Sequence, residues 1–221
     1  WWGWYFKLLK AGTAAPIYLF YDPRLRSEFH NGALFEPEEI RQTLPRAVQV
    51  ELKQSVRYTR QIFDFLAKLC LMRTDGALGA LKAHSALPQG PEIEFANTAP
   101  DQVSAAVREI LMNWRTHKYC SPDQVVIIGK RSTLEKSSLG GITELLAYGL
   151  ADYEEGLTSK IAYISAQRAR GLDFRSVILI DFLPYEQLFG EGGDSNLQKT
   201  FFLGASRTRQ LLGVVGVVKA G

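Results

Sequence analysis

Unbroken apolar runs, rather than alternating ones, set the pattern of the second half of this sequence. They occupy residues 124–129, 161–164, 177–181 and 211–218, and β-branched side chains are frequent in them. Apolar runs of about four to eight residues with turn signals at their ends are typical of strands buried on both faces of a parallel sheet. The pattern therefore predicts four core strands.

Apolar positions at helical spacing separate these runs and predict helices over residues 1–10, 60–72, 100–117 and 139–150. Shorter strands are expected at 16–21, 48–52 and 92–95, a first helical turn at 37–41, and a glycine-rich loop at 190–196. Helices that alternate with apolar strands predict an α/β fold, in which a mainly parallel β-sheet is flanked by helices and joined by right-handed crossovers.

The composition is typical of a globular protein and argues against a disordered chain. The chain has 221 residues, of which 46% are hydrophobic and 22% charged, and its formal net charge is +3. This mild positive charge permits a polyanionic partner without predicting one. Cys70 and Cys120 form no C-x-x-C pair, so neither a disulfide framework nor a zinc site is expected. Without a long apolar stretch, we expect no membrane partner and a cytoplasmic location, with nucleoid association in a bacterium.

Two polar segments beside the apolar runs carry arginines in patterns suited to phosphate. The first is Ser165-x-Gln167-x-x-Arg170-Gly171-Leu172-Asp173-Phe174, and the second is Leu203-Gly204-Ala205-Ser206-Arg207-Thr208-Arg209. The first resembles motif V of UvrD/Rep-type superfamily-one helicases, T-x-H-x-x-K-G-L-E-F. The second resembles their motif VI, V-A-x-T-R-A-R. The resemblance implies the second, C-terminal RecA-like domain of a DNA helicase.

Three other segments extend the resemblance along the chain. Arg57, in a turn between a strand and a helix, lies where motif IV has its arginine. Lys130 and Arg131 follow a strand as in the family's "ILVRS" segment, whose polar end faces nucleic acid. Asp22, at the end of a strand, takes the place of the acid in motif III, G-D-x-x-Q, although Leu25 replaces the glutamine.

The resemblance implies a role for each matched residue. Arg57 and Arg207 would be catalytic arginine fingers on the γ-phosphate of ATP, and Asp22, Gly171 and Asp173 would lie at the nucleotide. Contacts with single-stranded or partly duplex DNA would come from Ser165, Gln167, Arg170, Lys130 and Arg131. The ATP and its Mg²⁺ would be held mainly by the N-terminal RecA-like domain, and no metal ligand is expected in this chain.

The domain organisation follows from the same matches. Residues 1–45 are expected to end the first RecA-like domain or to connect the two domains. Residues 46–221 would form the second domain, without a large insertion. No G-x-x-x-x-G-K-[ST] sequence occurs, so this chain alone is expected to be inactive as an ATPase.

Two further interpretations stay open at this point. The replacements Leu25, Gln167 and Gly204 also suit a degenerate RecA-like module that binds nucleic acid or protein without efficient ATPase activity. Alternatively, the chain is an unrelated α/β nucleotide-binding or scaffold domain whose arginines are surface charges.

Overall fold

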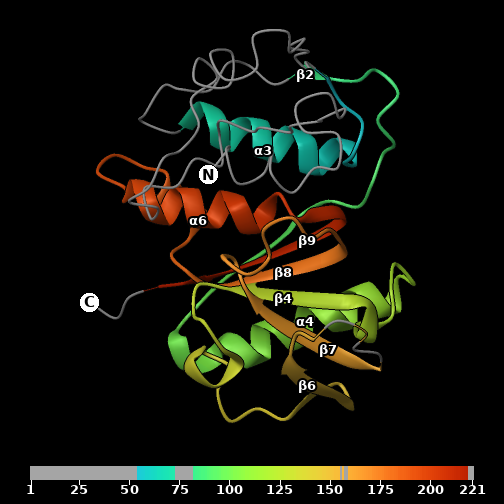
Figure 1. The fold of residues 1–221 in the computed structure, drawn as a ribbon, viewed down its shortest axis with the longest axis vertical. Coiled ribbons are helices and arrows are strands. Elements are labelled where there is room, and N and C mark those ends of the chain that lie inside the picture. Colours follow the sequence, from blue (N-terminus) through green and yellow to red (C-terminus); the bar gives the residue numbers. More distant parts are fainter. Residues whose placement is uncertain (1–53, 73–81, 155, 157–158, 219–221) are drawn as a thin grey trace, which may run out of the picture.

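A seven-stranded sheet forms the centre of the molecule in a computed structural model, which describes residues 54–72, 82–154, 156 and 159–218 (Figure 1). Its strand order is β3-β9-β8-β4-β7-β6-β5, and only β5 runs antiparallel to its neighbour. The predicted α/β class with a mainly parallel sheet is confirmed.

The four apolar runs form the middle of this sheet, as predicted. They are β4 (Val125–Gly129), β7 (Lys160–Ser165), β8 (Phe174–Phe182) and β9 (Thr208–Val217). Every residue of β4 is buried, and so are five of the six residues of β7. Because both faces of these strands are buried, their apolar residues do not alternate with polar ones.

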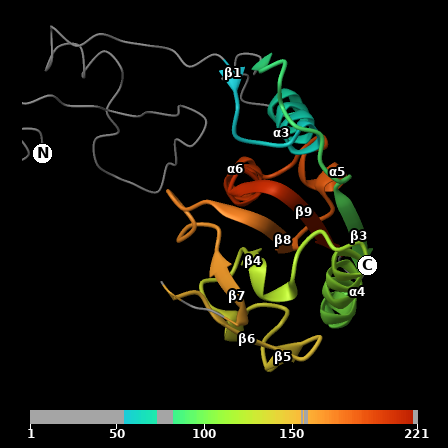
Figure 2. The same ribbon diagram turned by 90° about the vertical axis from the view of Figure 1, so that its right-hand side faces the viewer.

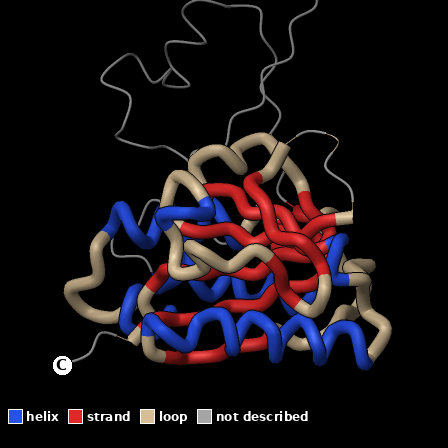
Figure 3. The backbone as a smooth tube through the Cα atoms, turned by 90° about the horizontal axis from the view of Figure 1, so that it is seen from below, coloured by secondary structure: helices blue, strands red, loops and turns tan. Residues whose placement is uncertain are grey.

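Helices cover the two faces of the sheet (Figures 1 and 3). On one face, α3 (Arg60–Met72) and α6 (Ser195–Ala205) share a core with Ile128, Leu179 and Val214. On the other face, α4 (Val103–Thr116) packs against Ile127 and Ile178. Adjacent residues of a strand thus point into opposite hydrophobic cores. The sheet is packed on both faces, and its strands hold the two arginine segments in place.

The helix predicted at 139–150 is wrong. The chain instead forms β5 (Glu144–Leu145) and β6 (Tyr148–Asp152), joined by a turn in which Leu146 and Ala147 have φ values of 52° and 63°. Gly141, with φ 81°, also lies in a conformation that an α-helix excludes. Pairing of β6 with the edge of β7 therefore overrides the helix propensity of the leucine and alanine residues.

The remaining elements are short. The strand expected at 92–95 is β3 (Glu94–Thr98), while β1 (Gln54–Ser55) pairs with β2 (Lys82–Ala83) apart from the main sheet. Helix α5 (Tyr185–Leu188) follows β8, and 3₁₀ turns lie at Pro100–Gln102, Pro122–Gln124 and Leu134–Lys136. Elements predicted before residue 54 lie outside the described residues.

No described helix has the length and apolarity to cross a bilayer.

Helix α6 leads the chain into the second arginine segment, and its first turn is capped by a side chain. One carboxylate oxygen of Asp194 accepts bonds from the backbone N–H groups of Asn196 and Leu197 at 2.8 and 3.2 Å. We expect Asp194→Ala to lower the free energy of unfolding by about 1 kcal/mol, measured by urea denaturation. Glu191→Ala, an exposed change in the preceding loop, is the control. Equal stability of the two variants would contradict the capping role.

Candidate functional site

Three segments that are distant in sequence meet where β8 and β9 begin. Phe174 and Thr208 are register partners at the amino ends of these strands, and Asp173 and Arg207 immediately precede them. Arg57 arrives from the turn before α3, because the Thr59 N–H donates to the Arg209 carbonyl at 3.1 Å. The amino edge thus brings Arg57, Asp173 and Arg207 together, and we call these three the arginine cluster.

An ion pair between Arg57 and Asp173 joins two of the three segments. The side chains are 31% and 43% exposed, although the Nε and Nη2 atoms of Arg57 are themselves buried. Partial burial lowers the pKa of Arg57, and the neighbouring positive charges of Arg207 and Arg209 act in the same direction. A guanidinium stays protonated at neutral pH in spite of such shifts. One carboxylate therefore faces three arginines, and the edge carries excess positive charge.

Arg207 is turned into the domain, with only 7% of its surface exposed. Its guanidinium donates to the carbonyls of Leu203 and Leu172 at 3.3 and 3.4 Å, and to the Ser206 hydroxyl at 3.1 Å. These bonds tie the end of α6 to the loop before β8. In this conformation Arg207 organises the amino edge, while Arg57 is half-buried and Arg209 is exposed.

The loop before β8 contains the sharp turn that the glycine predicts. Gly171 has φ 77°, the left-handed region that other residues avoid, and a Cβ there would meet no atom within 4 Å. Arg170 and Gly171 are both exposed. The glycine thus serves the backbone conformation and leaves an open approach to the main chain beside Asp173.

The other predicted residues cluster at the opposite, carboxyl edge of the sheet. Gly129 and Ser165 are register partners at the ends of β4 and β7, and Lys130 and Arg131 follow Gly129. Both basic side chains are exposed, as is Gln167. Ser165 is buried, however, and its hydroxyl accepts the Arg168 N–H at 3.3 Å, so it shapes the turn.

The structure describes nine of the ten predicted residues, and these nine are divided between the two edges of the sheet. The arginine cluster, with Gly171 and Arg170, lies toward the amino edge, and Lys130, Arg131, Ser165 and Gln167 lie toward the carboxyl edge. Asp22 lies outside the described residues. Among the residues that the structure describes, no three or more acidic, histidine or cysteine side chains gather as a metal site would require.

Sequence reasoning missed the groups that position the basic segment after β4. Asp181 accepts the Ser138 N–H at 3.0 Å and the Ser138 hydroxyl, Asp152 accepts the Leu134 N–H at 2.9 Å, and the Tyr163 hydroxyl donates to the Arg131 carbonyl at 2.8 Å. Burial, together with the charges of the two aspartates, raises the pKa of Tyr163, which keeps its hydroxyl protonated as a donor. A signal was available for Asp181, which ends the apolar run 177–181, but not for Asp152, because the strand that it ends was predicted as a helix.

Arg209 was also passed over as a site residue. It is exposed in β9 and close enough to Arg57 to affect the pKa of that guanidinium. The signal is the second arginine of Ser206-Arg207-Thr208-Arg209, which lies just before the apolar run 211–218 and therefore near the same end of the predicted strand as Arg207.

Comparison with known proteins leaves the function open. No protein-family model matches the sequence, and no curated protein matches it. A solved structure that is similar is the crystal structure of the C-terminal domain of a possible DNA helicase from Lactobacillus plantarum WCFS1. The identity is 16% and the TM-score 0.47, over 74% of this chain and 88% of that chain. A likeness at this level assigns no function to this chain.

Proposed function

We propose that residues 46–221 are the second RecA-like domain of an ATP-dependent DNA helicase of the UvrD/Rep type. The observation that supports this most is the meeting of Arg57, Asp173 and Arg207 at one sheet edge, although they come from three separate segments. These are the segments that match motifs IV, V and VI in spacing and order. An unrelated fold would have no reason to bring the three together.

The amino edge is the side of the domain that would face ATP. The arginine cluster suits the phosphates, because planar guanidinium groups give paired hydrogen bonds to phosphate oxygens. Arg57 would exchange its ion pair with Asp173 for the γ-phosphate, and Arg207 would leave the Leu172 carbonyl to do so. Asp173 and Gly171 would then approach the ribose.

The described residues fit only part of the nucleotide. They supply positive charge for phosphate but no cluster of acids that could hold Mg²⁺. The metal and most of the ATP would therefore be bound by the first RecA-like domain, and the two domains would share the cleft. ATP supplies the phosphoryl group whose developing negative charge the arginines stabilise.

The carboxyl edge is the side that would bind DNA. Lys130 and Arg131 are exposed on a segment that Asp152, Tyr163 and Asp181 hold in place. Exposed basic groups that contact phosphates give affinity without base recognition, as strand translocation requires. Gln167 and Arg170 would add hydrogen bonds, and the buried Ser165 would act by shaping the turn.

A second candidate function is a RecA-like clamp that binds nucleic acid without efficient ATPase activity. The inward position of Arg207 favours it, because three hydrogen bonds hold the guanidinium away from solvent. The two candidates share the DNA-binding edge and differ only at the amino edge. Measurements of ATPase activity therefore discriminate them, whereas measurements of DNA binding test what they have in common.

We expect the double variant Lys130→Ala, Arg131→Ala to weaken binding of oligothymidylate and to make it less dependent on salt. Each lost phosphate contact should reduce the slope of log K against log salt by about 0.7 for a single strand. Fluorescence anisotropy of a labelled oligothymidylate across a range of salt concentrations measures both effects.

The matched control is Arg108→Ala, Arg115→Ala, which also removes two exposed positive charges, from α4. It should lower the affinity only slightly, through the net charge. If both double variants lose the same affinity and slope, binding is a nonspecific consequence of charge and the proposed DNA edge is wrong.

A further inference from the structure

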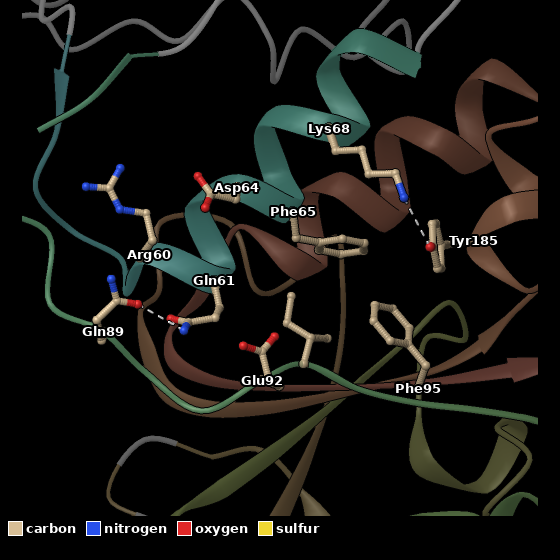
Figure 4. Close-up of a pocket in the computed structure, with 10 residues that line it drawn as sticks. Arg60, Gln61, Asp64, Phe65, Lys68, Gln89, Glu92, Phe95 and Tyr185 are labelled. Atoms are coloured by element: carbon tan, nitrogen blue, oxygen red, sulfur yellow. Dashed lines mark hydrogen bonds between the residues drawn. The ribbon is translucent and has the colours of Figure 1, made fainter.

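A groove beside the outer edge of the sheet lies away from both groups of predicted residues. It has a volume of about 400 Å³ and lies between α3, the segment before β3, and α5 (Figure 4). In the ribbon of Figure 2, these elements follow one another along one side of the molecule. We call it the β3 groove and define it by Asp64, Phe65, Lys68, Glu92, Phe95 and Tyr185.

Aromatic rings form the floor of the β3 groove. Phe95 makes an edge-to-face contact with Phe65 at 5.5 Å between ring centroids, and a tilted contact with Tyr185 at 5.0 Å. Although these contacts fix its ring, Phe95 is 46% exposed. Large aromatic side chains that are both held in place and open to solvent are typical anchor points for a partner.

The strand that carries Phe95, β3, is the last strand at one edge of the described sheet. Within the described part of the chain, β3 pairs with β9 on one side and with no strand on the other. An unpaired edge offers a row of backbone donors and acceptors that an added strand can satisfy. Because Phe95 points toward α3 and Tyr185, alternate side chains of such a strand would enter the β3 groove (Figure 4).

Two basic side chains, Arg60 and Lys68, and two acidic ones, Asp64 and Glu92, line the β3 groove. Lys68 donates to the Tyr185 hydroxyl at 3.3 Å and lies over its ring, and Arg60 donates to the carbonyls of His84 and Ser85 at 3.5 Å. The carboxylates of Asp64 and Glu92 have no hydrogen bond or ion pair within the described residues. Both basic groups stay charged but already have acceptors, whereas the two carboxylates have none, so they can pair with basic side chains of a ligand.

We propose that the β3 groove docks an extended peptide segment of a partner protein, in which an aromatic or apolar side chain is flanked by lysine or arginine. The segment adds a strand to β3, its apolar side chain packs against Phe95 and Tyr185, and its basic side chains pair with Asp64 and Glu92. This interaction uses neither sheet end, so it stands independently of the helicase proposal.

A heptapeptide probe can present these groups on one face of a strand. In acetyl-Thr-Lys-Thr-Phe-Thr-Lys-Thr, labelled with fluorescein, Phe and both Lys side chains point the same way when the peptide is extended. Anisotropy is measured with the 221-residue chain. The comparison probes replace both Lys by Glu, or Phe by Ala, and a labelled oligothymidylate tests for nucleic acid.

Three variants locate the binding. Phe95→Ala should weaken binding of the lysine probe about tenfold or more, the loss typical of an aromatic anchor. The double variant Asp64→Asn, Glu92→Gln should weaken it and remove most of its salt dependence, without changing the shape of the groove. Met112→Ala, which removes a 56% exposed apolar side chain from α4, should leave binding unchanged.

Four outcomes would overturn the proposal. They are no binding of the lysine probe, equal binding of the glutamate or alanine probe, loss of oligothymidylate binding in Phe95→Ala, and a self-association of the chain that this variant abolishes. The last two would assign the β3 groove to nucleic acid or to a second copy. None of these results bears on ATPase activity, so the two proposals can fail separately.

Discussion

Arg207→Ala is expected to lower the DNA-stimulated ATPase rate by about 10³ or more, in a protein that carries this domain together with the first RecA-like domain. Removal of an arginine that neutralises charge on the transferred phosphoryl group has effects of this size. A steady-state assay with saturating ATP and oligothymidylate measures the change in kcat. The Michaelis constant for ATP should change less, because most of the nucleotide is bound elsewhere.

The buried position of Arg207 requires that catalysis and folding be measured separately. Its loss removes the donor to the Leu172 carbonyl, which costs about 1–3 kcal/mol, whereas the Leu203 carbonyl still accepts from the Ser206 hydroxyl at 2.9 Å. Natural domains have total stabilities of about 5–15 kcal/mol, so the variant should still fold at the assay temperature. Urea denaturation of the same preparation shows whether the loss of rate exceeds any loss of folded protein.

Two control variants make the test specific for the guanidinium at position 207. Arg207→Lys keeps the charge but lacks the planar fork, and it should stay well below the wild-type rate. Arg175→Ala removes an exposed arginine at the same amino edge, where it contacts Gln210, and should leave the rate unchanged. A wild-type rate for Arg207→Ala would remove the finger assignment and favour the clamp.

How far the sequence predicts this fold depends on where each element lies. Strands β4, β7, β8 and β9 were predicted because burial on both faces leaves a continuous apolar run, which only a central strand has. At the sheet edge, the helix expected at 139–150 gave way to β5 and β6, because strand pairing there is a tertiary contact that local propensity does not encode.

The arginine cluster shows a similar division between what spacing predicts and what packing decides. The motif spacing placed Arg57, Asp173 and Arg207 together, since each lies next to an element whose position the sheet fixes. The inward turn of Arg207 was not predictable, because it depends on the Leu172 carbonyl, which belongs to a different loop.

The close packing of α6 explains one departure from the helicase pattern. Gly204 stands where motif VI has alanine, and a Cβ there would lie 3.0 Å from Leu179 and 3.2 Å from Ile128. These side chains come from the central strands β8 and β4, which have little freedom to move. The glycine thus lets the helix approach the sheet.

Phe201→Ala should be the most destabilising of the changes considered, since this ring joins the elements that hold the arginine cluster. Phe201 is fully buried, and its ring meets those of Phe65, Phe182 and Phe189 at centroid distances of 6.4, 5.2 and 5.7 Å. Truncating a buried phenylalanine costs about 3–5 kcal/mol, through lost burial and the cavity that is left. Urea denaturation followed by circular dichroism measures this loss.

Two further variants separate cavity formation from a general loss of apolar surface. Phe201→Leu should cost less than Phe201→Ala because it fills more of the space, and Met112→Ala on the exposed face of α4 should change stability by no more than about 0.5 kcal/mol. Because α6 leads directly into Arg207, Phe201→Ala should also reduce ATPase activity in proportion to the unfolded fraction. If Phe201→Ala were as stable as Met112→Ala, the aromatic core could not be what fixes α6, and the arginine cluster would need another support.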